Sequence, residues 1–520
     1  MTVGRGYVRV MCGIAALYQE QAGTDPLHTR AAGEWMLSRI THRGPDDKDH
    51  RLVGERAWLG HNRLSIVDLA GGRQPLNSPG GWSLVCNGEI YNHTDIRESL
   101  GRERFATSSD SESALVLLHM CGPDAFDRLQ GMWALCAAAP DGRFVAARDP
   151  LGIKPLYWAR TAEGVHFASE LRAFPPEVQA ATEAFPPGCY WTPETGLVRF
   201  AEAVPRGRAH RWDGVPAADA ESATREVLAD SVVRHLMADV DVGVFLSGGL
   251  DSSIVAAVAA AEYGSRGERL KTFAVGTPGS PDLLAAREVA EHLGTEHHET
   301  LLDAGRAISV VDQVVASVES FDASLIRSAV PNWFLSELAS RHVKAVLTGE
   351  GADELFAGYD YYHRGHAEPG RLELELRRTL GRLHGLNLQR CDRVTMAHGL
   401  EARVPFLDAD VIAHAMSLPS ELKSLEPDGM EKGHLRRAFT GWLPERLLWR
   451  RKVQFGTGSG AQDLLTPHFD GRVDDGELAA TVKESGVDLR TKEELAYYRV
   501  FRRALPSVRP EAVLTRFATA

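Results

Sequence analysis

The stretch VRVMCGIAAL, residues 8–17, places a methionine–cysteine pair inside the chain rather than at its start. A cysteine at the first position of a chain combines a nucleophilic thiol with a free α-amino group, whose pKa of about 8 suits proton transfer near neutral pH. In the written sequence Met11 acylates Cys12, so this chemistry requires the loss of residues 1–11. We expect either translation from Met11 followed by removal of that methionine, which we favour, or cleavage of residues 1–11 as a propeptide.

A second candidate site is the stretch SGGLDSS, residues 247–253, which lies between the apolar runs DVGVFL and IVAAV. Its glycines allow backbone N–H groups to approach an anion, and its serine hydroxyls and the N-terminus of a following helix add further donors. No GxxxxGK[ST] pattern is present, so this is not a Walker A loop. The stretch predicts a loop that cradles a polyphosphate.

An acidic stretch, VLTGEGADELFAGY at residues 346–359, ends another apolar run. On an ordinary surface these carboxylates would only be solvated. At the carboxyl ends of parallel strands beside a triphosphate, they become candidate Mg²⁺ ligands and a candidate catalytic carboxylate.

A complementary positive charge is available in RRKVQFGTGSG, residues 450–460, where Lys452 precedes a glycine-rich loop. Such a lysine is often only part of a basic surface. If the loop folds over a nucleotide, its ammonium group could stabilise the charge that develops on the α-phosphate or in a tetrahedral intermediate.

The segments that must position these residues change in character along the chain. From Cys12 to about Phe200, short alternating or aromatic-rich runs bounded by Gly, Pro and Asp predict an α+β domain with stacked antiparallel sheets. Beyond a Gly/Pro/Ala-rich linker, continuous apolar runs alternate with helical patterns, which predicts a doubly wound parallel α/β sheet. A helical part runs from about Leu372 to Phe517. We expect an extension or propeptide at 1–11, domains at 12–205 and 223–520, and a linker at 206–222.

The bulk composition limits the partners. The net charge of −12 gives no global attraction to nucleic acid or anionic membranes, and no apolar run approaches the roughly 20 residues needed to span a bilayer. The 6 cysteines lack CxxC spacing, which argues against a zinc site or a disulfide framework. The adjacent pair His297 and His298 would point to opposite faces of a strand, so we interpret both as structural. We expect a cytoplasmic enzyme whose substrates are small molecules.

Taken together, these stretches resemble glutamine-hydrolysing asparagine synthetases of the bacterial B type, from Met11 to about Leu505. The similarity rests on the ordered motifs MCGI, HRGPD, RLSIVD, NGEIYN, SSDSE, GIKPLY, SGGLDSS, FAVGTPGSPDL, GEGADE, LEARVPFLD and DGMEKGHLRRAF. It implies an N-terminal-nucleophile glutaminase with four αββα layers, followed by a synthetase domain of the adenine-nucleotide α-hydrolase type. The implied substrates are ATP, aspartate and glutamine, with Mg²⁺ and a homodimeric assembly. Ammonia would pass through an internal tunnel to a β-aspartyl-AMP intermediate.

The resemblance also implies roles for individual residues. Catalysis falls to Cys12, to Asn87 and Gly88 as an oxyanion hole, and to Glu350 and Lys452. The implied glutamine site consists of Arg63, Leu64, Ile66, Val67, Asn87, Gly88, Glu89 and Asp110. The implied ATP site consists of Leu246, Ser247, Gly248, Gly249, Leu250, Asp251, Ser252, Val275, Thr348 and Gly349. Asp251 and Asp353 match the magnesium region.

Arg63 can bind the α-carboxylate of glutamine bidentately, and Asp110 can bind its α-ammonium group. Arg327 is a candidate for holding the acid substrate and equally a candidate for a helix-side ion pair.

Two departures from the family pattern bear on the acid substrate. The loop after Lys452 reads FGTGSG where many relatives have FSDGVG, and SAVP follows Arg327 where bacterial relatives have a Ser-Thr pair. One alternative is therefore a related glutamine-dependent ligase that acts on another carboxylic acid in secondary metabolism. A different class is a non-catalytic protein that retains the fold, but none of the expected site residues is lost.

Overall fold

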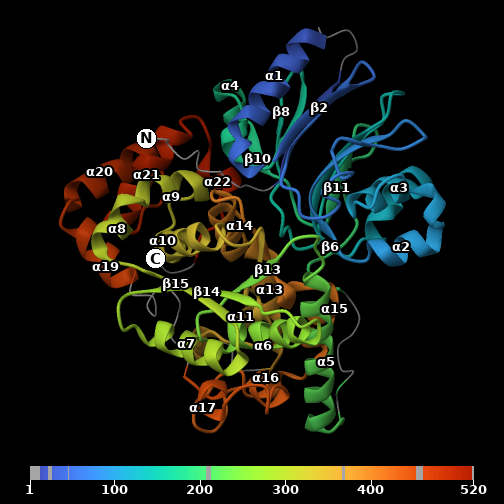
Figure 1. Cartoon of the computed structure of the whole chain (residues 1–520). Coiled ribbons are helices and arrows are strands. Elements are labelled where there is room, and N and C mark those ends of the chain that lie inside the picture. Colours follow the sequence, from blue (N-terminus) through green and yellow to red (C-terminus); the bar gives the residue numbers. More distant parts are fainter. Residues whose placement is uncertain are drawn as a thin grey trace, which may run out of the picture.

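The computed structural model describes residues 12–20, 26–44, 46–205, 212, 214–365, 369–451 and 461–517. Two stacked antiparallel sheets form the N-terminal part, and a parallel sheet forms the centre of the C-terminal part (Figure 1). The first eleven residues, and the loop that contains Lys452, lie outside the described ranges.

The two antiparallel sheets have six strands each. The first sheet runs in the order β10 (Thr182–Ala184), β8 (Tyr157–Arg160), β9 (Gly164–Ala168), β1 (Gly13–Gln19), β3 (Ala57–Arg63) and β2 (Asp47–Val53). The second runs in the order β12 (Gly196–Arg199), β11 (Cys189–Thr192), β7 (Phe144–Arg148), β6 (Gly131–Ala138), β5 (Ser83–Ile90) and β4 (Leu76–Asn77).

Alternation along β1 shows how the layers pack. Ile14 and Ala16 face the second sheet, where they share a core with residues of β5, β6 and β7. Ala15 and Leu17 face the opposite way and pack against α1 (Pro26–Arg39). On the outer face of the second sheet lie α2 (His93–Leu100) and α3 (Ser111–Cys121). The result is the predicted αββα arrangement.

The third sheet is parallel throughout. Its order is β15 (Glu296–Leu301), β14 (Lys271–Gly276), β13 (Val242–Phe245), β16 (Ala345–Leu347) and β17 (Glu401–Arg403). From β13 the chain first moves outward through β14 to β15 and then returns to β16 on the other side, so the winding reverses between β13 and β16. Ligands bind at the carboxyl ends of strands at such a reversal. The doubly wound prediction is confirmed.

Helices connect and cover the parallel sheet. Those between its strands include α6 (Leu250–Ser265), α7 (Pro281–Leu293) and α10 (Ala323–Ala339). The other described α-helices are α4 (Pro176–Gln179), α5 (Ala217–His235), α8 (Ala304–Ser309), α9 (Val311–Val318), α11 (Ala352–Leu355), α12 (Asp360–Gly365), α13 (Pro369–Arg382), α14 (Asn387–Met396), α15 (Ala409–Ser417), α16 (Gly433–Ala438), α17 (Glu445–Leu448), α19 (Ala461–Asp470), α20 (Asp475–Ser485), α21 (Lys492–Ala504) and α22 (Pro510–Val513). Helix α5 begins inside the predicted linker.

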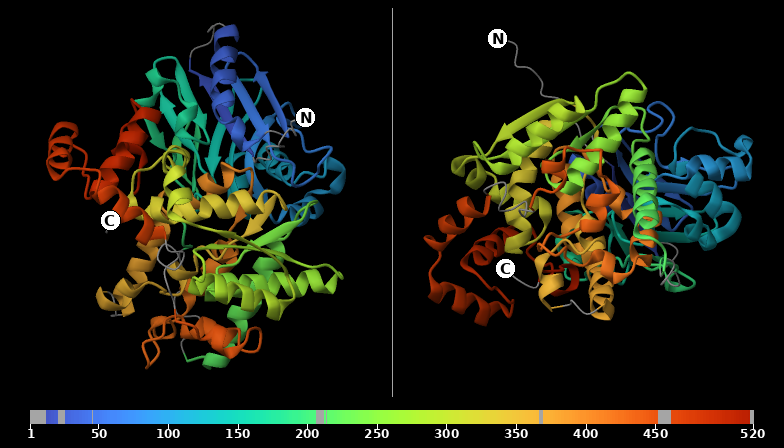
Figure 2. Two further views of the ribbon diagram at one scale, coloured as in Figure 1. Left: turned by 60° about the vertical axis from the view of Figure 1, so that its left-hand side comes forward. Right: turned by 90° about the horizontal axis from the view of Figure 1, so that it is seen from below.

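The C-terminal helices return to the N-terminal part of the chain (Figure 2). Arg509, just before α22, donates through Nε to the carbonyl of Ala180 at 2.8 Å. None of the helices within the described ranges has the length and apolar character that crossing a membrane requires.

Buried ion pairs join the two parts. Arg43, in the loop after α1, contacts Glu170 and Asp392 at 2.8 Å each, and its side chain is fully buried. Such pairs hold two elements in one relative position, because a buried charge without its partner is strongly unfavourable.

Candidate active sites

Cys12 stands immediately before β1 and packs against the core that contains Leu64 and Met132. It lies two residues from Ile14, so its side chain projects toward the second sheet. The thiol donates to the carbonyl of Leu64 at 3.6 Å, and Arg43 Nε donates to the carbonyl of Cys12 at 3.1 Å. Burial raises the pKa of the Cys12 thiol to about 12. The thiol is therefore protonated at neutral pH, and a nucleophilic role needs a base beside it.

Asn87 projects into the same space from the other sheet. On β5 it shares a face with Val85, which belongs to the core between the sheets, and its side chain is fully buried. Both polar atoms of that side chain lack a hydrogen-bond partner among the described residues. A buried unpaired amide is costly, so this side chain fits a donor that bonds a ligand oxygen.

Gly88, the next residue, has a φ of +135°. A Cβ at this position would lie 1.9 Å from the carbonyl oxygen of Met132 on the neighbouring strand. Only glycine fits here, and the conformation it permits places its backbone beside Asn87.

Arg63, the last residue of β3, organises the loop that follows it. Its guanidinium donates to the carbonyls of Val67, Asp68 and Leu69 at 3.2, 2.6 and 3.3 Å. The predicted carboxylate-binding arginine is thus tied to the loop that contains Leu64, Ile66 and Val67, three of the other predicted glutamine contacts.

That loop is also anchored to the C-terminal part of the chain. Leu64 and Ile66 are each 3% exposed and share a core with residues of α5 and α6, and Val67 packs against the same core. The carbonyl of Ile66 accepts from the N–H of Asp239 at 3.0 Å, and the N–H of Asp68 donates to the Asp239 carboxylate at 2.7 Å.

Asp110 and Glu89 supply buried carboxylates at the same end of β5. Asp110 accepts from the N–H of Ile90 at 2.7 Å, and burial raises the pKa of Asp110 to about 6. A buried carboxylate is hard to ionise when no ligand is bound, and a cationic ligand stabilises its charged form. The α-ammonium group of an amino acid is such a cation. The structure places both residues in the predicted glutamine region.

The phosphate loop joins β13 to α6. Gly248 has a φ of +69°, and a Cβ there would lie 2.5 Å from the backbone nitrogen of Ala286. The Ser247 and Ser252 hydroxyls lie 3.0 Å apart, and the N–H of Gly249 donates to Ser247 Oγ at 3.3 Å. The loop therefore has a defined shape, with the N-terminus of a 16-residue helix behind it.

A pocket opens over this loop, and most of the residues that line it are charged. Its lining consists of Ser247, Gly249, Leu250, Asp251, Asp282, Asp353, Glu431, Lys432, Arg436, Arg450 and Arg451. Arg450 is fixed by bonds to the Gly248 carbonyl at 3.2 Å and to Asp282 at 2.7 Å. Cations thus face the phosphate loop across the pocket.

The acidic stretch after β16 packs directly on the phosphate loop. A Cβ on Gly349 would lie 2.9 Å from Asp251 Cβ and from the Ser252 nitrogen, so the two loops touch at this glycine. Thr348 is buried, and Glu350 is paired with Arg390. Burial raises the pKa of Glu350 in spite of that arginine.

Two residues of this site were missing from the sequence-based assignment. Lys432 Nζ lies 2.7 Å from both carboxylate oxygens of Asp251 and 2.6 Å from Asp353. Glu354 is buried, accepts from Tyr359 at 2.8 Å, and has a pKa that burial raises to about 7. Both lie in stretches already noted for their similarity, but a lysine 181 residues away from Asp251 has no local signal of its partner.

The remaining predicted site residues are Leu246, Val275, Arg327 and Lys452. Leu246 and Val275 are buried at the ends of neighbouring strands, and Leu246 N–H donates to the Phe273 carbonyl at 2.8 Å. Arg327, on α10, contacts Glu493 of α21 through two nitrogens at 2.9 and 2.6 Å, which matches its ion-pair alternative. Lys452 lies outside the described residues.

Arg403 of β17 connects the two sites. Its guanidinium contacts Glu89 at 3.3 Å and Glu401 at 2.7 Å, and its carbonyl accepts from the N–H of Thr348 at 3.0 Å. Glu401 in turn contacts Lys154 at 3.1 Å. One buried residue therefore touches Glu89, which is predicted for the glutamine site, with its side chain and Thr348, which is predicted for the ATP site, with its backbone.

An αββα domain with a cysteine at the start of its first core strand, joined to a doubly wound sheet with a phosphate loop, defines a glutamine amidotransferase coupled to a nucleotide-dependent synthetase. Comparison with known proteins agrees. The family model described as Glutamine amidotransferase domain matches residues 11–189, and that described as Asparagine synthase matches residues 223–379 and 365–515.

Curated relatives extend over nearly the whole chain. Asparagine synthetase [glutamine-hydrolyzing] 3 of Arabidopsis thaliana is 38% identical and covers 95% of this chain and 88% of its own length. The probable asparagine synthetase [glutamine-hydrolyzing] of Schizosaccharomyces pombe is 38% identical, with 94% and 92% covered. Asparagine synthetase B [glutamine-hydrolyzing] of Escherichia coli is 37% identical, with 95% and 92% covered. The chain belongs to the glutamine-hydrolysing asparagine synthetase family and is a carbon–nitrogen ligase.

Proposed function

We propose that the chain synthesises L-asparagine from L-aspartate, ATP and L-glutamine, and releases AMP, pyrophosphate and L-glutamate. The observation that carries this proposal is the identity of 37–38% with named asparagine synthetases over 94–95% of the chain. The alternative, a ligase for another carboxylic acid, is not favoured by these relatives.

In the glutaminase half, the α-amino group of Cys12 takes the proton of the thiol as the sulfur attacks the amide carbon of glutamine and forms a tetrahedral intermediate. The unpaired amide of Asn87 and the N–H of Gly88 donate to the new oxyanion. Collapse of the intermediate forms a thioester and expels ammonia, with the proton supplied by the α-amino group of Cys12. Water then hydrolyses the thioester to glutamate. Arg63 and Asp110 hold the α-carboxylate and the α-ammonium group.

In the synthetase half, the aspartate side-chain carboxylate attacks the α-phosphorus of ATP, and pyrophosphate leaves. The backbone and hydroxyls of the 247–253 loop hold the β- and γ-phosphates, while Leu246, Val275, Thr348 and Gly349 contact the rest of the nucleotide. Ammonia then attacks the β-carbonyl of aspartyl-AMP and expels AMP. Glu350 and Lys452 remain our candidates for assisting these steps.

The residues present fit a magnesium ion beside the phosphates. Asp251 and Asp353 converge on one cation, Lys432 Nζ, within 2.7 Å, so these two carboxylates can share a metal ion held nearby. Bound there, Mg²⁺ would neutralise phosphate charge. Lys432 keeps the carboxylates together when the nucleotide is absent.

Ammonia passes from the first site to the second inside the protein in this proposal. The buried contacts of Arg403 support it, because they hold Glu89 and Thr348 in one rigid unit. We assign residues 12–205 to the glutaminase, 206–222 to the linker and 223–520 to the synthetase. A homodimer in the cytoplasm completes the proposal and rests on the family resemblance.

The acid substrate is tested by ATP–pyrophosphate exchange, which reports formation of the acyl-adenylate without any nitrogen donor. We expect exchange that depends on aspartate and exceeds that with glutamate, malate or succinate at equal concentration. Exchange with another acid and none with aspartate would overturn the assignment.

A further inference from the structure

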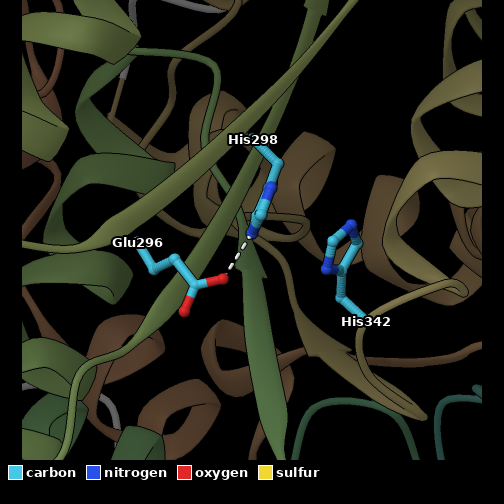
Figure 3. A group of neighbouring side chains, drawn as sticks. All are labelled: Glu296, His298 and His342. Atoms are coloured by element: carbon cyan, nitrogen blue, oxygen red, sulfur yellow. Dashed lines mark hydrogen bonds and ion pairs between the residues drawn. The ribbon is translucent and has the colours of Figure 1, made fainter.

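Three metal-ligating side chains converge at a place remote from the residues assigned to either reaction. Glu296 and His298 belong to β15, the edge strand of the parallel sheet, and His342 lies just after α10 (Figure 3). One donor atom of each side chain lies within 4.8 Å of the other two. No second convergence of His, Cys, Asp or Glu donors of this kind occurs in the part of the chain that the structure describes.

The period of two along the strand brings the first two donors together. Glu296 and His298 project from the same face of β15, and His298 Nε2 lies 2.8 Å from Glu296 Oε1. His297 projects from the opposite face, where its nitrogens contact Thr272 at 2.9 Å and Glu299 at 3.2 Å. The adjacent histidines therefore have separate environments, as the sequence predicted, and the second imidazole of the cluster comes from a distant segment.

His342 is held against His298 before any ion is bound. The backbone N–H of His342 donates to the Ala339 carbonyl at 2.9 Å at the end of α10. The two imidazole rings lie 3.9 Å apart between centroids, and each also packs near the ring of Phe273, at 5.5 Å for His298 and 5.7 Å for His342. These aromatic contacts hold the two imidazoles side by side.

The surrounding charges permit a cation. Lys271 is the register partner of Glu296 on β14, but its ammonium group is paired with Asp241 at 2.5 Å. The Glu296 side chain is 45% exposed and that of His298 is 24% exposed, so an ion can enter from solvent and keep water as a further ligand.

We propose that Glu296, His298 and His342 form a binding site for a divalent transition-metal ion, with Zn²⁺ as the best match. Two imidazole nitrogens and one carboxylate oxygen are a donor set that zinc accepts in tetrahedral geometry, with water in the fourth position. On binding, bonds to the ion would replace the direct contact between Glu296 and His298.

The position of the site indicates a structural effect. A bound ion would link the edge strand β15 to the segment between α10 and β16. Strand β16 then leads into the predicted nucleotide loop. An ion that binds the folded chain but not the unfolded chain raises the melting temperature. We therefore expect a metal-dependent gain in stability rather than a new reaction.

The test is titration of the EDTA-treated and desalted full chain with ZnCl₂, followed by competition with a chromophoric chelator. His298→Ala and His342→Ala should each bind one Zn²⁺ fewer than the wild-type chain, and Zn²⁺ should no longer raise their melting temperature. The matched control is His297→Ala, which removes a neighbouring imidazole from the other face and should behave as wild type. Equal stoichiometry and equal thermal shifts in all four proteins would overturn the proposal.

Thermal unfolding of each variant in EDTA shows whether that variant folds in the absence of a metal ion. A variant that fails this check is replaced by Glu296→Gln, which changes one partly exposed oxygen donor to an amide and should weaken Zn²⁺ binding by about tenfold or more. Unchanged affinity in Glu296→Gln would count against the site. Cobalt substitution adds a spectroscopic check, because a tetrahedral site should give intense visible absorption that His298→Ala lacks.

Discussion

At the scale of single residues, the side chain of Asn87 gives much of the structural support for the proposed glutaminase reaction. It is a fully buried amide with both polar atoms unpaired among the described residues, and it faces the space that Cys12 borders. Natural proteins rarely leave such groups unsatisfied, so its cost is best explained by a bond that forms during the reaction.

Replacing Asn87 with alanine should lower glutamine-dependent asparagine formation by about 100-fold, because one oxyanion donor contributes about 3 kcal/mol. Ammonium-dependent formation should stay within about twofold of wild type, since that reaction bypasses the thioester. Both rates are measured as AMP release. Equal losses with glutamine and with ammonium would show that Asn87 supports the fold instead.

Asp110 predicts a pH limit on glutamine use. Burial raises its pKa to about 6, so the carboxylate is charged above that pH and protonated below it. The charged form is the one that binds the α-ammonium group of glutamine. The α-amino base already lowers kcat/KM for glutamine hydrolysis by about tenfold per pH unit below about pH 8, and protonation of Asp110 should steepen this fall to about a hundredfold per unit below about pH 6.

Asp110→Asn should remove the steepening below about pH 6, keep the limb set by the α-amino base, and give low activity at every pH. ATP–pyrophosphate exchange at the other site serves as the control and should keep its own profile. A steepening that persists in Asp110→Asn would assign that titration to a different group.

At the scale of elements, the phosphate loop depends on the positive φ of Gly248. Alanine there would be strained in the left-handed region and would clash with the backbone of Ala286 at 2.5 Å. We expect Gly248→Ala to raise the KM for ATP by at least about tenfold, which corresponds to 1.4 kcal/mol.

Gly264, near the end of the same helix α6, is the matched control. A Cβ there meets nothing within 4 Å, so Gly264→Ala should leave ATP use unchanged and stabilise the helix by about 0.5–1 kcal/mol. Glutamine hydrolysis should be normal in both variants. An unchanged KM for ATP in Gly248→Ala would show that the loop does not bind the phosphates of ATP.

Sequence reasoning reached the elements because their signals are local. The short strand patterns bounded by Gly, Pro and Asp before about Phe200, and the contiguous 247–253 loop, can be recognised without knowing what they pack against. It did not reach Lys432, the contacts of Arg403 or the pairing of His298 with His342. These depend on which segments the fold brings together, and neither charge nor periodicity along the chain specifies a partner more than a few residues away.

At the scale of the whole molecule, buried ion pairs keep the two catalytic parts in register. Arg43 reaches from the N-terminal part to Asp392 on α14, and it also donates to the carbonyl of Cys12. Disturbing it should therefore affect stability and the glutaminase together.

Arg43→Met should lower the free energy of unfolding by about 3–5 kcal/mol, because it leaves buried carboxylates without a partner. The exposed pair of Arg102 and Glu98, 2.8 Å apart with side chains 72% and 59% exposed, gives the control. Arg102→Met should cost less than about 1 kcal/mol. Guanidinium unfolding followed by fluorescence measures both, and similar losses in the two variants would contradict the proposed importance of the interface.

In the proposed function, one chain moves nitrogen from glutamine to an ATP-activated aspartate. The most direct measurement supplies amide-¹⁵N-glutamine, aspartate and ATP to the chain that begins at Cys12, and follows asparagine by mass spectrometry. We predict ¹⁵N-asparagine in equal amount to AMP, and only unlabelled asparagine from the chain that retains residues 1–11 when unlabelled ammonium is added. Absence of labelled asparagine from the chain that begins at Cys12, while it forms asparagine with ammonium, would contradict the account.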